Sequence, residues 1–350
     1  MNLPLSKMKV IVLSFTFIAA FTSEAFSQVN LDRILVTGQE DARKITEMYV
    51  TPMVKGFSSG LNNGWYISAK PHKPLGFNLT VSVSAALVPE EDEFFLFRNE
   101  DFTNIKLTDS DLTESLSPTV MGPAEAGPNV TVYNDQFGAN VPLDNFDLAE
   151  GLGLEEEFGA NAVPAPMATL GIGLVKNTDL IVRFMPKVEN DDGSFYMYGV
   201  GLKHDIKQWI PVVNALPFDL SVFGGYTKLN GELNLEGTFD GENQRGMMDI
   251  EAKTVQLLVG KKLGILNVYA GAGYDFTTTH TQILGEYILS YSNVSNTTVR
   301  VEDPVDFIID TQHVRAIAGL GLKLGPLAIS GDYSISEYHS VTAAVSVAIR

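Results

Sequence analysis

The chain has 350 residues, of which 42 are acidic and 24 basic, giving a formal net charge of −18. This excess of negative charge argues against nucleic acid as a partner, because a surface that binds phosphates must be basic. The chain has no cysteine, which excludes disulfide bonds, thiolate metal sites and a thiol nucleophile.

Residues 1–27 have the pattern of a secretory signal peptide. Two lysines precede an apolar run at residues 10–20, and the small residues Ala25 and Ser27 stand before the expected cleavage site. The apolar run is too short to span a bilayer as a helix, which takes about 20 residues. We therefore expect an exported protein that starts at Gln28; the alternative is a retained N-terminal anchor.

Residues 28–60 hold the helix-like pattern of the mature chain. Its apolar residues at helical spacing are Ala42, Ile45, Met48 and Tyr49. Acidic residues come early, and we expect Pro52 to break the helix, with Gly56 and Gly60 beyond the break.

The first clear strand pattern follows at residues 77–87. Apolar residues alternate there with polar or small ones without exception, which is typical of a strand with two unlike faces. The loop before it, residues 60–77, carries Trp65 and Tyr66, residue types that prefer the interface between membrane and water.

The alternation is lost between residues 89 and 166, where acidic residues, Gly and Pro dominate. We expect short strands at 102–107 and 129–133 that pair as one extra hairpin. Acidic runs at 90–93 and 155–157 carry the oxygen ligands that calcium prefers. They lack a fixed ligand spacing, so a solvated acidic loop is the favoured interpretation.

Strand patterns then follow in close succession. They cover residues 170–176, 180–188, 195–203, 218–229, 254–262, 266–276, 312–324, 327–336 and 339–350. The expected short connections are tight turns near residues 177, 264 and 325 and an interfacial segment at 205–217. The expected long polar connections are residues 231–248 and 280–310.

These patterns predict a transmembrane antiparallel β-barrel. The strands run to about ten residues, as membrane-spanning strands do, whereas strands of soluble proteins average about 5 to 6. We count ten strands and expect between ten and fourteen, with twelve as the central value if the extra hairpin joins the wall. With the C-terminus in the periplasm, every short connection falls inside and every long one outside, as in outer-membrane barrels. The predicted organisation is a signal peptide (1–27), an N-terminal helix segment (28–60) and the barrel (61–350).

The alternation also assigns the two faces of the wall. Val345 is expected to touch lipid and Ser346 the lumen. The glycine pairs expected to face inward, where they leave room in a crowded lumen, are Gly171 and Gly173, Gly199 and Gly201, Gly271 and Gly273, and Gly319 and Gly321. The ionisable residues expected to face inward are Arg183, Asp219, Asp275, Arg315 and Asp332. These charges either form a polar pathway or pair across the lumen, because a buried unpaired charge is costly.

The N-terminal helix either plugs the barrel or packs on its periplasmic rim. We favour the rim, because the inferred lumen offers mainly Gly, Ser and charged residues to the apolar side of the helix. If the helix gated the barrel nonetheless, removal of residues 28–55 would be expected to open it.

Two sequence blocks resemble a known family. GLNNGWYISAKPHKPLGFNLTVSVSAALVPEEDEFF (60–95) and KHDIKQWIPVVNALPFDLSVFGGYTKL (203–229) are similar to exported proteins of unknown function from Bacteroidota, whose members are regarded as outer-membrane β-barrels. The C-terminal VSVAIR also resembles barrels of that phylum. The resemblance implies the barrel fold, but no activity, substrate or catalytic residue. A more distant similarity, of architecture alone, is to FadL-type transporters of hydrophobic compounds, because an N-terminal segment precedes the barrel.

The sequence offers no catalytic, cofactor-binding or metal-ligating set. The five histidines, none at a metal-binding spacing, are His72, His204, His280, His313 and His339. His339 and Ser340 come nearest to a catalytic pair, but they would point to opposite faces of one strand. We therefore expect neither an enzyme nor a cofactor.

The patterns favour an outer-membrane barrel that lets small molecules, hydrophobic ones included, pass. The alternative is a structural or surface barrel whose acidic loops bind a partner. The expected partners are the lipid and lipopolysaccharide of the outer membrane and a small-molecule substrate, with no nucleic acid.

Overall fold

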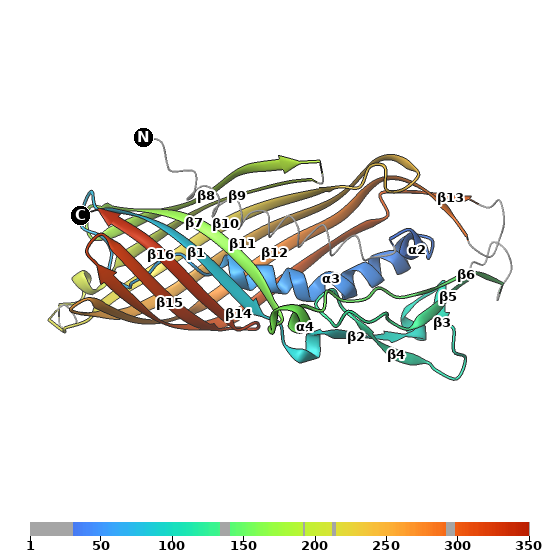
Figure 1. Cartoon of the computed structure of the whole chain (residues 1–350). Helices are drawn as coiled ribbons and strands as arrows, with labels where there is room; N and C mark the ends of the chain where they lie inside the picture. The colour runs from blue at the N-terminus through green and yellow to red at the C-terminus, as the bar shows by residue number, and fades with distance from the viewer. Residues whose placement is uncertain (1–30, 134–140, 192, 212–214, 292–297, 350) are drawn as a thin grey trace.

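Ten antiparallel strands close into a barrel (Figure 1). The computed structural model describes residues 31–133, 141–191, 193–211, 215–291 and 298–349; the expected signal peptide lies outside them. The ring closes because β1 pairs with β16 and β11 with β12. Its strands are β1 (Phe77–Leu87), β7 (Ala162–Leu174), β8 (Thr178–Asn190), β9 (Gly193–Asp205), β10 (Asp219–Asn234), β11 (Gly241–Leu263), β12 (Leu266–Ser290), β14 (Val305–Leu324), β15 (Leu327–Ile335) and β16 (Ser340–Ile349).

The faces of the wall are those predicted from the alternation. Val345 points outward with 49% of its surface exposed, whereas Ser346 is fully buried in the lumen. The outward-facing residues of β14 are apolar from Val314 to Leu324. With a rise of about 3.3 Å per residue and the usual strand tilt, this stretch spans about 25 Å, the height of the apolar band of an outer-membrane barrel.

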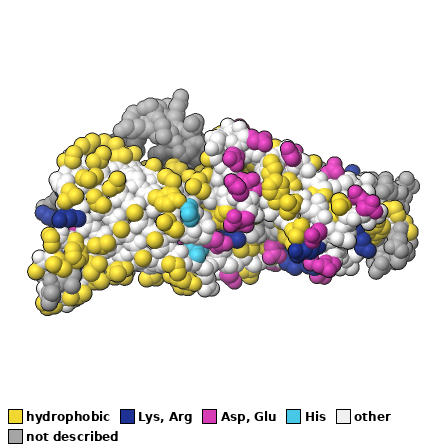
Figure 2. Space-filling view, turned by 90° about the horizontal axis from the view of Figure 1, so that it is seen from below, with side chains coloured by type: hydrophobic (Ala, Val, Ile, Leu, Met, Phe, Trp, Pro, Cys, Tyr) yellow, Lys and Arg dark blue, Asp and Glu magenta, His cyan; other side chains and the backbone are white. Residues whose placement is uncertain are grey.

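The barrel has two unlike ends. One end, here called the turn end, carries the tight β7–β8, β11–β12 and β14–β15 turns and the short η4 (Lys207–Trp209) between β9 and β10. The other, the loop end, carries the long connection between β1 and β7. Apolar side chains cover the half next to the turn end, and acidic side chains gather on the half next to the loop end (Figure 2). We call these the membrane half and the loop-end half.

The wall is much taller on one side than on the other. Strands β11, β12 and β14 have 23, 25 and 20 residues, whereas β15, β16 and β1 have 9, 10 and 11. The long polar loops predicted at 231–248 and 280–310 are therefore mostly strand. A further strand, β13 (Thr298–Glu302), pairs with the end of β12. The prediction failed because outward polar residues meet water there, so the contrast between apolar and polar faces is lost.

Residues 88–161, here called the cap, fold over the loop end beside the low wall (Figure 1). The described elements are η1 (Glu90–Asp92), β2 (Phe94–Arg98), η2 (Asn99–Asp101), β3 (Ile105–Leu107), β4 (Glu114–Pro118), β5 (Asn129–Tyr133), β6 (Pro142–Asp147) and α4 (Leu154–Phe158). Strand β2 pairs with β4, and β5 lies between β3 and β6. The extra hairpin predicted from residues 102–107 and 129–133 thus belongs to a small separate sheet, which is why the ring has ten strands and not twelve.

The N-terminal segment lies inside the ring. Helix α2 (Leu31–Leu35) stands at the loop end, and α3 (Gln39–Leu61) runs from there towards the barrel (Figure 1). Helix α3 contacts β1, β7 and β14. Pro52 does not end the helix. None of the helices in the described part of the chain is long and apolar enough to cross a membrane.

Two glycines explain how α3 fits against the wall. Gly56 and Gly60 face Val163 and Ala165 of β7, and a Cβ at either glycine would collide with these side chains. The helix continues past Pro52 because its C-terminal half is packed on this wall. The apolar partners that the sequence did not reveal come from the cap and from the tall strands, for example Val120 and Ile283, which lie in one buried cluster with α3.

Candidate functional site

The bore of the membrane half is occupied by the chain itself. After α3 ends at Leu61, residues 61–72 run down the lumen to the turn end, where β1 begins at Phe77. This lumen segment bonds to β8, β9, β10, β11 and β14, strands that together surround it. Trp65 and Tyr66, expected from the sequence at a membrane interface, are buried inside the barrel.

Two buried arginines hold the end of α3. The Arg183 guanidinium donates to the carbonyls of Leu61 (2.6 Å) and Asn63 (2.6 Å). Arg315, from the opposing β14, donates to the carbonyl of Asn62 at 2.9 Å and to the Asn63 side chain. The last carbonyls of a helix have no partner within it and carry the negative end of its dipole. The two cations therefore cap α3 where it enters the membrane half.

The two arginines differ in how their charge is balanced. Arg315 forms an ion pair with Asp275 at 3.1 Å, and both side chains are almost fully buried. Within the described residues no carboxylate lies within ion-pair distance of Arg183, which instead stacks 3.8 Å from the ring centre of Trp65. The pairing expected across the lumen is thus found for one arginine, while the other is bound to the lumen segment.

The remaining inward charges lie in two places. Asp332 accepts a hydrogen bond from Tyr269 at 2.8 Å within the lumen. Asp219 is only partly buried and lies 3.5 Å from Lys70 near the turn end. Among the described residues, no ion pair joins either aspartate to Arg183 or Arg315.

Aromatic side chains of the lumen segment fill the middle of the bore. The ring centres of Trp65 and Tyr66 lie 5.5 Å and 5.3 Å from that of Phe223 on β10. Gly201 and Gly225 face Trp65, and a Cβ there would lie 3.1 Å and 2.9 Å from its ring. These inward glycines therefore make room for the indole. Some of the glycines in the wall are thus explained by the side chains of the lumen segment.

A buried charge cluster holds the segment at the turn end. Asp179 of β8 accepts from the backbone N–H of His72 at 2.7 Å and lies 3.0 Å from its Nδ1. Lys203 pairs with the same carboxylate at 3.2 Å and donates to the carbonyl of Ser68 at 3.1 Å. The void beside this cluster measures ≈ 20 Å³, room for about one water molecule. The lumen is closed here.

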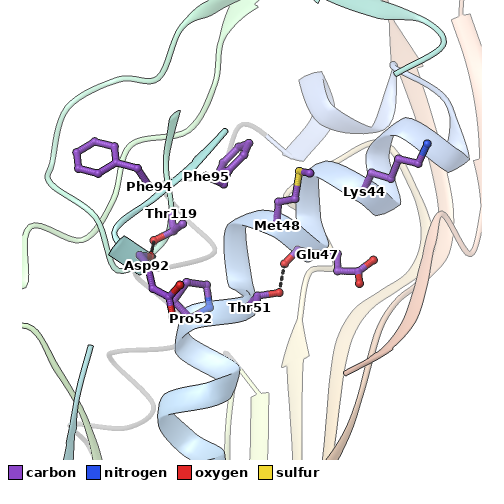
Figure 3. Close-up of a pocket in the computed structure, with 9 residues that line it drawn as sticks. All are labelled: Lys44, Glu47, Met48, Thr51, Pro52, Asp92, Phe94, Phe95 and Thr119. Atoms are coloured by element: carbon purple, nitrogen blue, oxygen red, sulfur yellow. Dashed lines mark hydrogen bonds between the residues drawn. The ribbon is translucent and has the colours of Figure 1, made fainter. Parts of the chain in front are cut away.

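A larger pocket lies at the loop end, between α3 and the cap (Figure 3). Its volume is ≈ 370 Å³. The helix contributes Met48 and Pro52, and the cap contributes Asp92, Phe94 and Phe95. Both acidic runs noted in the sequence lie in the cap, but only the first reaches this pocket; Glu155, Glu156 and Glu157 are exposed on α4.

Polar contacts fix α3 and the cap to the β15–β16 connection beside this pocket. Lys55 pairs with Glu337 at 2.8 Å, and the Tyr338 hydroxyl donates to Asp92 at 2.5 Å. Partial burial opposes the change, but the hydrogen bond to Glu337 and the nearby carboxylates raise the pKa of Lys55. Burial, together with the bond to Asp92, raises the pKa of Tyr338 as well. Both groups therefore stay protonated at neutral pH.

The five histidines contact different partners: His72 contacts Asp179, His204 contacts Thr178, His280 contacts Asp306, His313 contacts Asp275 and His339 contacts Tyr333. His339 is exposed and bonds to Tyr333, whereas its neighbour Ser340 is buried on the other face of β16. Among the described residues, no group of three or more His, Asp or Glu side chains is placed to hold a metal ion.

The sequence missed the partners of the inward arginines. Alternation places Arg183 and Arg315 in the lumen but cannot say that a helix end lies between them. A signal was present in the three consecutive large apolar residues Trp65, Tyr66 and Ile67, which are unusual for a loop in water and need a buried surface.

A family model matches residues 7–349, nearly the whole chain; its description is "Family of unknown function (DUF6588)". The chain belongs to this family. No curated protein is significantly similar to it in sequence. The expectation of a family of unknown function is confirmed, while the phylum and the likeness to FadL-type transporters stay predictions.

Among solved structures, the translocator domain of the autotransporter NalP from Neisseria meningitidis is similar at 9% identity and a TM-score of 0.33, with 88% of this chain and 98% of that chain covered. Ail, the attachment invasion locus protein of Yersinia pestis, is similar at 8% identity and a TM-score of 0.25, with 79% and 97% covered. At these scores neither likeness carries information on what this protein does. The architecture itself, a closed ring with an apolar band, is that of an outer-membrane β-barrel.

Proposed function

We propose that this protein is an outer-membrane passage for small molecules that its own N-terminal segment keeps shut. In this proposal the lumen segment is the gate, and molecules cross only when residues 61–72 leave the membrane half. The observation that supports it is the capping of α3 by Arg183 and Arg315, because these contacts are polar and non-covalent and hold the end of the lumen segment that joins α3.

The composition of the wall favours a bore that the lumen segment can leave. Small barrels of about eight strands fill their interior with side chains from the wall. Here many inward positions are Gly, Ser or Thr, for example Gly201, Ser221 and Thr227, and the filling comes from a separate stretch of chain. Withdrawal of that stretch would leave a polar-lined opening, whereas a barrel closed by its own wall could not open.

The proposed orientation places the turn end in the periplasm and the loop end outside the cell. Short turns and the C-terminal strand end characterise the periplasmic side of outer-membrane barrels. The proposal includes export by the signal peptide and insertion into the outer membrane, with lipid and lipopolysaccharide around the apolar band.

Single-channel recording in planar bilayers tests the gate. The mature protein should show no conductance above background. A variant with Arg183→Gln, Arg315→Gln and Asp275→Asn removes both caps without leaving a buried charge unpaired, and should conduct at least about tenfold above that background. Deletion of residues 28–55 alone should not open the barrel, because residues 61–72 fill the membrane half; deletion of residues 28–70 should.

An engineered disulfide bond between the lumen segment and the wall provides a reversible control. A Cβ at Gly64 would lie 3.5 Å from the Cβ of Ser82 on β1, which suits a disulfide bond. Gly64 has a positive φ of 69°, so Gly64→Cys costs about 1 to 2 kcal/mol. Added to the uncapped variant together with Ser82→Cys, it should abolish conductance when oxidised and restore it on reduction. Conductance that is the same in the oxidised and the reduced protein would refute the gate.

The second candidate is a non-transporting barrel that presents a binding surface. It is favoured by the acidic side chains gathered on the loop-end half (Figure 2). If the uncapped variant and the 28–70 deletion fold but never conduct, this candidate replaces the first.

A further inference from the structure

The surface of the loop-end pocket is more apolar than polar. Met48 of α3 and Phe95 of β2 lie next to each other, Pro52 lines the pocket from the helix, and Phe94 lies further out with 37% of its surface exposed (Figure 3). Ligand sites commonly have volumes of about 300 to 1,000 Å³, with aromatic linings and a few polar groups. At ≈ 370 Å³, this pocket suits a ligand with a single ring and a short chain.

The polar groups in the pocket are mostly acceptors. Asp92 Oδ2 accepts from Tyr338, but its Oδ1 receives no hydrogen bond from any residue that the structure describes. Asp92 Oδ1 can therefore take a donor from a ligand.

The one cation among the lining residues is already engaged. Lys44 pairs with Glu40 at 3.2 Å and donates to the carbonyl of Asp101 at 2.9 Å. In Figure 3 its side chain extends away from Asp92. Two further cations lie beside the carboxylates of the lining: Arg43 pairs with Glu47 at 2.6 Å, and Lys55 Nζ lies 3.8 Å from Asp92 Oδ2. The acceptor that remains open at the end of the pocket beside Pro52 is Asp92 Oδ1.

We propose that the loop-end pocket binds a small amine with an aromatic body, an arylalkylamine. Its ring lies between Met48 and Phe95, where sulfur–aromatic and ring–ring contacts are favourable. Its ammonium group donates to Asp92 Oδ1, a charge-assisted hydrogen bond. The inference does not depend on the gate, because binding is measured without any passage.

Calorimetric titration of the mature protein in detergent tests the assignment with three probes. 2-Phenylethylamine has both features, 3-phenylpropionate has the ring with the opposite charge, and butylamine has the amine without the ring. 2-Phenylethylamine should bind at least about tenfold more tightly than either of the others. Absence of binding, or equal binding of 3-phenylpropionate, overturns the proposal.

Matched variants locate the site. Asp92→Asn and Phe95→Ala should each weaken 2-phenylethylamine binding about tenfold. The controls are Glu125→Gln, an exposed acid of the cap, and Leu116→Ala, an exposed apolar residue of β4; neither should change the affinity.

A variant that fills the pocket with a larger side chain tests the proposal even if Asp92→Asn destabilises the protein. Met48→Trp occupies the pocket from α3 and leaves Asp92 and Tyr338 as they are. It should abolish binding of 2-phenylethylamine. Binding that survives both Met48→Trp and Phe95→Ala means that the amine binds elsewhere, which also overturns the proposal.

Discussion

Strand β12 passes through both halves of the barrel and reverses its faces between them. In the membrane half its outward residues are apolar, as at Tyr274 and Phe276, and inward Asp275 is charged. In the loop-end half its outward residues are polar, as at Thr278 and Gln282, and inward residues Ile283, Tyr287 and Leu289 are apolar and buried. The difference follows from what lies outside: lipid excludes polar side chains from the first surface, and water draws them to the second.

This reversal explains what fills each half. In the loop-end half the inner wall, α3 and the cap share one apolar cluster, as in the core of a soluble protein. In the membrane half the filling is held by hydrogen bonds and charges around Arg183 and Arg315. The halves should therefore respond differently to the same kind of substitution.

The largest difference is expected for arginines. Arg315→Ala leaves Asp275 buried without its partner, which should cost about 3 to 5 kcal/mol. Arg300, on β13, has its side chain 70% exposed and pairs with Glu286 at 3.0 Å, so Arg300→Ala should cost less than about 1 kcal/mol. Urea unfolding in detergent measures both. The double variant Arg315→Gln with Asp275→Asn should recover part of the loss; if Arg315→Ala is as mild as Arg300→Ala, the buried pair is not formed.

A second difference is expected on the outer face of β14. Leu320 and Ile308 point outward with 56% and 57% of their surfaces exposed, but only Leu320 lies within the apolar band. Leu320→Arg near the midplane should cost about 2 to 4 kcal/mol, and Ile308→Arg less than about 1 kcal/mol. The folded fraction by heat modifiability on gels reports the effect. Equal losses would mean that the membrane covers a different part of the strand.

A third difference lies within the inner face of β12. Ile283→Thr puts a hydroxyl into the apolar cluster and should cost about 1 to 3 kcal/mol. Thr279 is fully buried and its hydroxyl has no partner among the described residues, so Thr279→Val should be neutral or slightly stabilising. Thermal unfolding compares the two. A loss at Thr279→Val similar to that at Ile283→Thr would place the change of polarity further along the strand.

The same comparison explains which strands could be predicted. The bounds of β1 and the faces of β14 to β16 follow from strict alternation, which lipid on one side and a polar lumen on the other impose. The sequence pattern predicts loops for the extensions of β11 and β12 because their faces offer little contrast in polarity: Thr277, Thr279 and Thr281 face inward while Thr278 and His280 face outward.

For the candidate site, alternation gave the direction of a side chain but not its partner. Arg183 and Arg315 could be placed in the lumen from the sequence. Their bonds to Leu61, Asn62 and Asn63 depend on a helix that reaches the ring from the loop end, and no local pattern encodes that path. The loop-end pocket likewise joins Met48 to Phe95, residues whose nearness arises only when the cap folds over α3.

The smallest expected effect concerns pH at the contact between α3 and the β15–β16 connection. The pKa of Lys55 is raised in the folded protein, so its contribution to stability is fully present below its ordinary value of 10.5 and is lost as the pH rises through the folded value. Tyr338 has the same sign, because its pKa is raised above 10.0. The contact should therefore hold from pH 6 to 9 and weaken only beyond about pH 10.5.

Thermal unfolding of Lys55→Met against the wild type isolates this effect. The gap in stability between the two proteins should stay constant from pH 6 to 9 and narrow above about pH 10.5, because the wild type then loses the charge that the variant never had. Lys106→Met removes an exposed lysine of β3 in the cap and provides the control for a general change of charge. A gap for Lys55→Met that stays constant at high pH, or that widens, would mean that Lys55 does not hold α3 to Glu337.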